Sequence, residues 1–122
     1  MMGISYRLDL AVAELQLGDR PAAERELNTV LAMVNGMLAA GVERYATYEL
    51  RAKIYALKGQ ADDAMRDLDT AIKLGWRRAW WAANEPYFVS LRNRSDFQAR
   101  MLQVSRSNDE LIETLKADPT RY

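Results

Sequence analysis

The sequence contains no cysteine and no histidine among its 122 residues. Their absence excludes disulfide bonds, thiolate nucleophiles, Cys/His zinc sites and catalytic triads built on histidine. No stretch approaches the roughly 20 apolar residues that a membrane span requires. The start of the chain mixes charged with apolar residues and so does not resemble a signal peptide. We therefore expect no membrane insertion, no cofactor and no metal.

The chain also has no excess of either charge, because 17 Lys and Arg residues balance 17 Asp and Glu residues. This balance removes the general electrostatic reason to bind nucleic acid or an anionic membrane surface. Hydrophobic residues make up 49% of the chain, which is enough for a buried core. We expect one domain over residues 1–122 in the cytoplasm, or in the periplasm if a membrane-anchored parent protein carries it.

Only three prolines and six glycines interrupt the chain, and their positions predict an all-α fold by marking helix ends. The predicted helices cover 2–17, 21–40, 43–58, 61–74, 76–83 and 84–92, and one long last helix runs from 95 to Asp118-Pro119. Three alternatives stay open. The alternation of apolar residues over 4–12 also suits a strand, the second helix could end at Asn35-Gly36, and a capping motif at Ser107 could break the last helix.

Internal repetition is the most informative pattern in the sequence. Large, small and turn-forming residues follow one another at Tyr48, Ala52, Tyr55, Gly59, Ala64, Leu68 and Ala71. Small Ala52 and Ala64 would let two antiparallel helices approach, and Gly59 would form the turn between them. Over residues 45–76 this pattern resembles the tetratricopeptide repeat (TPR). A weaker copy precedes it, with Ala11, Gly18, Ala23 and Leu27 in the corresponding places.

The resemblance implies TPR-like antiparallel helix pairs in a right-handed superhelical stack, closed by short helices and one long C-terminal helix. Residues 1–41 would form a degenerate first repeat, 42–75 the second repeat, and 76–122 the capping helices. The tryptophan spacing favours a structural cap over the apolar face of the last repeat. We expect this cap to consist of Trp76, Trp80, Trp81 and Phe97.

The segment after Gly75 adds a second resemblance. Its pattern comprises Gly75-Trp76, the aromatic pair Trp80-Trp81, Asn84-Glu85-Pro86, Leu91-Arg92 and Asp96-Phe97. It is similar to the closing segment of the TPR tails of bacterial winged-helix transcription regulators and class III adenylate cyclases. The resemblance implies a non-catalytic interaction or scaffold module, the regulatory tail of a larger signalling protein. No effector activity is carried by these residues.

Two surfaces are candidates for a protein or peptide partner. In TPR stacks the first helix of each pair lines a concave groove, which here predicts a groove formed by Ala46, Glu49, Lys53 and Ala56. The helix predicted over 2–17 is apolar on more than one face and should be covered on both sides. We therefore predict that Leu8, Val12 and Leu15 pack on an upstream repeat or on a second copy of the chain, as a homodimer.

Two other classes of function compete with this interpretation. The segment Trp76–Arg106 has six arginines against Glu85 and Asp96 and could stack on nucleic acid bases, although the neutral chain argues against a nucleic-acid partner. A small enzyme would need an acid–base pair of Asp, Glu, Lys or Tyr in a cleft. The four aspartates over 62–69 are better explained as a solvated helix face, and Met33 and Met37 as core residues.

Overall fold

The computed structural model describes residues 3–117 and contains only helices within them. The elements are α1 (Ile4–Gln16), α2 (Arg20–Ala39), α3 (Tyr45–Leu57), α4 (Ala61–Lys73), α5 (Ala79–Asn84), the 3-10 helix η1 (Pro86–Leu91) and α6 (Ser95–Ala117). This confirms the all-α prediction for the described part of the chain. Residues 4–12 are helical rather than a strand, and α2 continues past Gly36.

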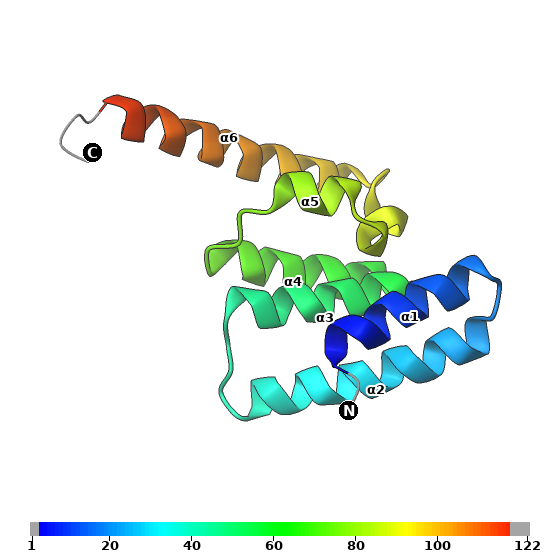
Figure 1. Ribbon diagram of the computed structural model, residues 1–122. Helices are drawn as coiled ribbons and strands as arrows, with labels where there is room; N and C mark the ends of the chain where they lie inside the picture. The colour runs from blue at the N-terminus through cyan, green and yellow to red at the C-terminus, as the bar shows by residue number, and fades with distance from the viewer. Residues whose placement is uncertain (1–2, 118–122) are drawn as a thin grey trace.

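The first four helices form two antiparallel hairpins, α1 with α2 and α3 with α4, which lie side by side (Figure 1). Each of these four helices is followed, two residues after its end, by a glycine with positive φ, where a residue with a Cβ would be strained. At the end of α3, Gly59 has φ 80°, and the Gln60 amide donates back to the Tyr55 carbonyl at 2.9 Å. The other helix-ending glycines are Gly18, Gly41 and Gly75. The sequence predicted a break at each of these four glycines.

The core consists of two apolar clusters that meet on α3. Ile54 belongs to the cluster shared with α1 and α2, whereas Ala52 and Ala56 belong to the cluster shared with α4 and the C-terminal elements. Ala52 and Ala64 are both fully buried, in agreement with the expected close approach of α3 and α4. One helix thus links the two halves of the core.

The segment after α4 departs from the predicted helix bounds. The Trp76 amide donates to the Ala71 carbonyl at 2.9 Å and completes the end of α4. Residues 76–78 are not helical, and α5 starts only at Ala79. The helix predicted over 84–92 is the short 3-10 helix η1, which is kinked at Phe88.

The last helix is a single element through Ser107, and its predicted end at Asp118-Pro119 lies outside the described residues. Its first half is buried against α4 and α5 through Phe97, Met101 and Val104. The Asn108 side-chain amide donates to the Arg77 carbonyl at 3.0 Å. Beyond this contact α6 projects away from the rest of the molecule (Figure 1).

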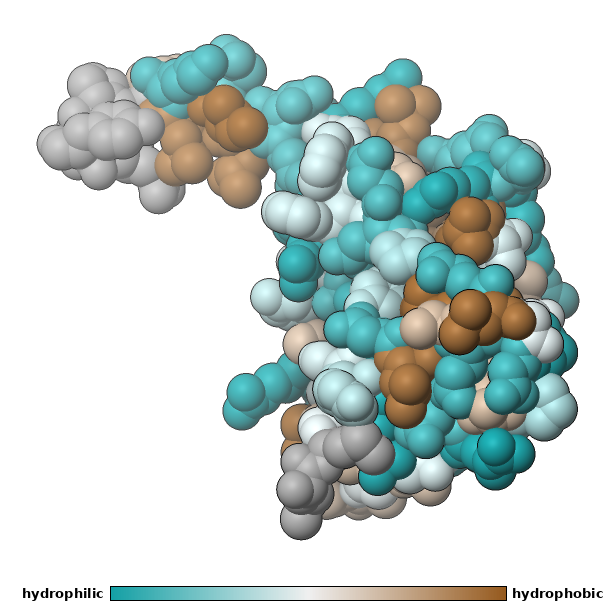
Figure 2. Space-filling view, turned by 45° about the vertical axis from the view of Figure 1, so that its right-hand side comes forward, coloured by the Kyte–Doolittle hydropathy of each residue, from teal (hydrophilic) through white to brown (hydrophobic). Residues whose placement is uncertain are grey.

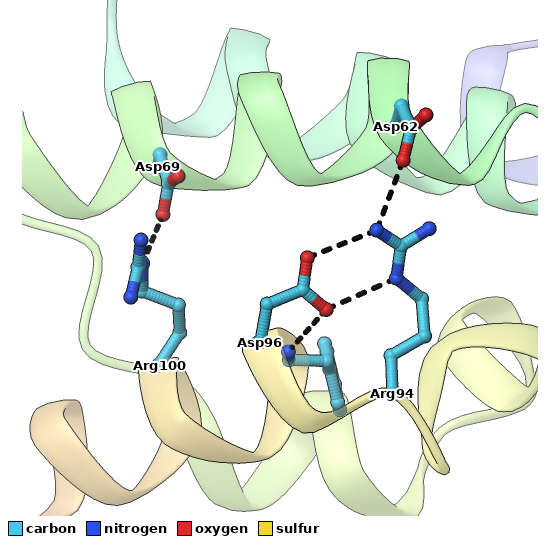
Figure 3. A network of polar contacts seen from close by, with 6 residues as sticks. Asp62, Asp69, Arg94, Asp96 and Arg100 are labelled. Atoms are coloured by element: carbon cyan, nitrogen blue, oxygen red, sulfur yellow. Dashed lines mark hydrogen bonds and ion pairs between the residues drawn. The ribbon is translucent and has the colours of Figure 1, made fainter.

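Charged side chains fasten the start of α6 to α4 (Figure 3). The Arg94 guanidinium binds both carboxylate oxygens of Asp96, at 3.0 and 2.9 Å, and also the Asp62 carboxylate of α4 at 2.9 Å. Arg100 binds Asp69 of α4 at 2.6 Å. The bond from Arg94 holds the pKa of Asp96 below its usual value. Within residues 3–117, no helix combines the length and the apolar character that crossing a membrane requires.

Candidate functional site

The face of α3 that was predicted to line a groove is covered by η1 of the same chain. The Ser90 hydroxyl donates to the Ala56 carbonyl at 3.1 Å. The Lys53 ammonium lies 4.7 Å from the centre of the Tyr87 ring and 3.7 Å from the Glu85 carboxylate. Phe88 and Leu91 of η1 are also fully buried. η1 therefore occupies the place on α3 where a bound peptide was expected.

Glu49 is buried beside this contact and has its own partner. The indole N–H of Trp76 donates to the Glu49 carboxylate at 2.7 Å, and the Arg78 guanidinium lies 4.0 Å away. A buried carboxylate without such partners would be costly. The four predicted groove residues were Ala46, Glu49, Lys53 and Ala56. Only Ala46 remains exposed, so the prediction of an open groove along α3 is corrected.

A cavity of about 450 Å³ remains open next to η1, where η1 approaches α1. Its lining consists of Val12, Leu15, Gln16, Leu57, Asn84, Pro86, Val89 and Arg92. Five of these eight residues are aliphatic or proline, and Arg92 is the one charged member. Arg92 donates to the Glu85 carbonyl through its terminal nitrogen, while its Nε is buried and has no acceptor within residues 3–117. Figure 2 shows hydrophobic side chains on this side of the molecule, over α1 and η1.

The apolar face of α1 is covered largely by this chain itself. Leu8 is only 2% exposed and packs in the core with α2 and α3. Val12 and Leu15 are half-buried and line the cavity. The prediction that Leu8, Val12 and Leu15 together face an upstream repeat or a second copy is thus corrected for Leu8, which is buried within this chain. As the sequence indicates, α1 is apolar on two sides, but η1 of the same chain covers part of this apolar surface.

In addition to its contacts with α3, η1 forms a hydrogen bond with α1. The Tyr87 hydroxyl donates to the Asp9 carboxylate of α1. Burial of the ring, together with this bond, raises the pKa of Tyr87 well above its usual value. Tyr87 thus stays uncharged and keeps its donor over the physiological pH range. Nothing in the sequence pattern singled out Tyr87, because its partners lie far away in the chain.

The predicted aromatic cap is only half formed. Trp76 and Phe97 are buried as expected, but Trp80 is 65% exposed and Trp81 is 50% exposed. The reason is that the short α5 buries Ala79 and Ala82, which are at i and i+3, and so turns the two tryptophans between them outward. The prediction that all three tryptophans seal the last repeat is therefore wrong for Trp80 and Trp81.

These two exposed rings form a compact patch with neighbouring arginines. The Trp80 and Trp81 rings meet edge to face with their centres 4.9 Å apart. The Arg78 guanidinium lies 5.8 Å from the centre of the Trp81 ring. Arg77 precedes Arg78 in the chain, and its guanidinium donates to the Trp76 carbonyl. An exposed cluster of this kind is typical of a contact surface.

Most arginines of the basic segment Trp76–Arg106 are already used within the chain. Arg94 and Arg100 form ion pairs with aspartates of α4 and α6, and Arg92 bonds a backbone carbonyl. The local positive charge is therefore smaller than the sequence suggests. A continuous cationic track, as single-stranded nucleic acid requires, is not present on the described surface.

The buried carboxylate of Asp67 serves a structural ion pair. Arg51 binds both oxygens of the buried Asp67, at 2.7 and 2.8 Å, and also Asn35 of α2 at 3.0 Å. The hydrogen bonds to the Asp67 carboxylate raise the pKa of Arg51. Between residues 3 and 117, no three acidic side chains gather in a way that would hold a metal ion. The cluster joins α2, α3 and α4, and its Arg51 and Asp67 also line a small cavity of about 230 Å³ between α3 and α4.

Comparison of the chain with protein-family models, with curated proteins and with solved structures gives no match. The cavity at α1, the covered face of α3 and the exposed tryptophan pair are therefore the features that bear on function.

Proposed function

We propose that this chain is a non-catalytic, TPR-like protein-interaction module that binds a peptide segment of a partner protein in the cavity between α1 and η1. One observation carries the proposal: a short segment of the chain, η1, already lies across α3 in the way a peptide ligand would. The cavity beside η1, between η1 and α1, is not filled by the chain. The two hairpins, whose first helices both border η1, support the TPR-like superhelical arrangement.

The cavity walls define the chemistry of the peptide. A volume of about 450 Å³ falls within the usual range of ligand pockets. Val12, Leu15 and Val89 offer aliphatic contact for an apolar side chain of the peptide. Arg92 also lines the cavity and offers a positive charge to a carbonyl or carboxylate beside that side chain. The preferred ligand is thus a short segment that combines an aliphatic residue with a hydrogen-bond acceptor.

The setting of the module is part of the same proposal. The closing segment that resembles bacterial TPR tails has Trp76 and Phe97 buried in the core. This burial supports a role as the regulatory tail of a larger cytoplasmic signalling protein, a transcription regulator or a nucleotide cyclase.

A displayed library of random peptides, selected on the full chain, tests the proposal. We expect selected peptides to carry an aliphatic residue and to bind Val89→Asp at least tenfold more weakly, since the charge would sit at the apolar cavity wall. Leu102→Asp is the matched control, because Leu102 is similarly exposed (52% against 57%) but lies on α6. Circular dichroism checks that both variants fold. Failure to select any peptide, or equal binding to both variants, would overturn the proposal.

A further inference from the structure

The exposed tryptophan pair and the two arginines before it form a small surface that we call the Trp–Arg patch, defined as Arg77, Arg78, Trp80 and Trp81. Within residues 3–117 it is the one place where two exposed aromatic rings touch. The two ring planes stand at 89° to each other and so form the walls of an open corner. Trp80 is the freer ring, because the Arg78 guanidinium lies over Trp81. The corner thus offers ring surface that the described part of the chain does not cover.

The Trp–Arg patch has free hydrogen-bond donors but no free backbone acceptor. An indole can only donate, and of the three indole N–H groups only that of Trp76 has an acceptor within residues 3–117. Each of the four backbone carbonyls of the patch already accepts a hydrogen bond. The donors to these carbonyls are, in chain order, the Asn108 side chain, the Ala82 amide, the Asn84 side chain and the Glu85 amide. A ligand of this patch must therefore supply acceptors.

The two arginines of the patch are partly used within the chain. The Arg77 guanidinium donates to the Trp76 carbonyl. The Arg78 guanidinium lies 4.0 Å from the buried Glu49 carboxylate, which offsets part of its positive charge. A phosphate or carboxylate ligand would therefore gain less here than beside two free cations. The rings and their N–H groups, rather than the charges, are what the patch leaves available, and they favour an uncharged ligand with exposed acceptors.

We propose that the Trp–Arg patch binds a proline-rich segment of a partner protein in the polyproline II conformation. This conformation has no internal hydrogen bonds, so its carbonyls are free to accept from the indole N–H groups of Trp80 and Trp81. Proline has no amide hydrogen, so the segment brings no donor that the patch would leave unpaired. Its rings lose no rotamer freedom when they pack on the indoles, and aromatic-lined surfaces are the usual docking sites of such segments. None of the four patch residues lines the cavity at α1, so this site is additional to the peptide site there.

Fluorescence anisotropy of a dye-labelled peptide of ten prolines, titrated with the full chain, tests the proposal. We expect a saturable rise in anisotropy. A glycine–serine peptide of the same length with the same dye is the control, because it has the same backbone carbonyls but neither rings nor a preformed polyproline II helix. A deca-proline peptide that does not bind, or that binds no more tightly than the glycine–serine peptide, would overturn the proposal.

Two substitutions of Trp80 separate the role of its ring from that of its donor. Trp80→Ala should weaken deca-proline binding roughly tenfold or more, since large aromatic side chains carry most of the affinity of such contacts. Trp80→Phe keeps a ring but lacks the N–H, and should weaken binding about two- to tenfold. Tyr6→Ala is the matched control, because Tyr6 is similarly exposed (58% against 65%) but lies on α1. Circular dichroism checks that the three variants fold. Normal binding by Trp80→Ala, or an equal loss in Tyr6→Ala, would refute the assignment of this patch.

Two acidic probes distinguish recognition of proline from attraction of charge. A polyglutamate peptide offers carboxylates to Arg77 and Arg78, and an oligothymidine of similar length adds bases that stack on aromatic rings. We expect both to bind more weakly than deca-proline. Raising the salt concentration from about 50 to about 200 mM should leave deca-proline binding nearly unchanged, because no counterions are released. Tighter binding of either acidic probe, or loss of deca-proline binding at the higher salt concentration, would contradict a proline-rich ligand.

Discussion

Glu49 and Trp76 illustrate how a few buried polar atoms position the C-terminal half of the molecule. The Glu49 carboxylate on α3 accepts the indole N–H of Trp76, which is itself fully buried. This bond fixes the start of the segment that leads into α5 and η1. The bond thus contributes to the orientation of both elements over α3, together with the contacts that η1 makes with Lys53 and Ala56.

Replacing Glu49 by leucine should therefore destabilise the fold by about 1–3 kcal/mol, the usual cost of a buried donor left without an acceptor. Glu49→Gln should cost less, because its amide oxygen still accepts from the indole. Urea unfolding followed by circular dichroism measures both free energies. Equal losses in the two variants would show that the hydrogen bond is unimportant and that only packing around position 49 matters.

The three tryptophans show that residue type alone does not predict which side chains are buried. Residue type alone predicts burial for all three rings, and Trp76 follows that prediction. Trp80 and Trp81 do not, because α5 begins only at Ala79 and buries Ala79 and Ala82 instead. A shift of the helix start by three residues changes which side chains face the core.

At the scale of whole helices, the glycines explain why the element ends were predictable. Gly18 adopts φ 82° at the end of α1, with no neighbouring atom within 4 Å of an added Cβ, so steric crowding plays no part there. Gly36 lies inside α2 with equally open surroundings but without positive φ. The two positions differ only in backbone conformation, which makes them a matched pair.

Gly18→Ala should cost roughly 1–2 kcal/mol of stability, because the left-handed backbone disfavours a Cβ. Gly36→Ala should instead gain roughly 0.5–1 kcal/mol, since alanine is the better residue in a helix interior. Thermal and urea unfolding of both variants measure the difference. Two changes of the same sign would contradict the assignment of Gly18 as a left-handed helix end.

The same elements show what the sequence left undetermined. The bounds of α2 and α4 fall within one residue of those predicted, because proline, glycine and terminal charges act locally. The 3-10 helix η1 was predicted only as a generic short helix. Its form depends on contacts with Asp9, Lys53 and Ala56, which lie 30 or more positions earlier in the chain. Local patterns carry no information on such contacts.

At the scale of the whole molecule, α3 joins two apolar clusters and should make unfolding a single event. Leu27 is fully buried in the cluster of α1, α2 and α3, whereas all three tryptophans lie beyond α4. Leu27→Ala should lower the free energy of unfolding by about 2–5 kcal/mol. If the halves are coupled, tryptophan fluorescence and circular dichroism should shift together to lower urea concentration. A fluorescence transition that stays in place would show two independent halves.

The candidate site belongs to this largest scale, which explains why it was only partly foreseen. The sequence identified the face of α3 that η1 covers and the unusual apolarity of α1. It assigned both to an external partner, because nothing in a periodic pattern tells whether a complementary surface lies on another chain or further along the same one. The cavity at Val12 and Leu15 is what remains after η1 has taken its place.

The position of η1 on α3 has one more consequence, for any peptide directed at that helix. Because η1 is tethered to α3 through residues 58–85 of the same chain, it competes at an effective concentration of roughly millimolar order. A free peptide that binds α3 with the same intrinsic affinity as η1 would have to exceed that concentration before it displaced η1 from Lys53 and Ala56. The open cavity at α1 has no such tethered competitor among the described residues, so weak ligands should be detectable there first.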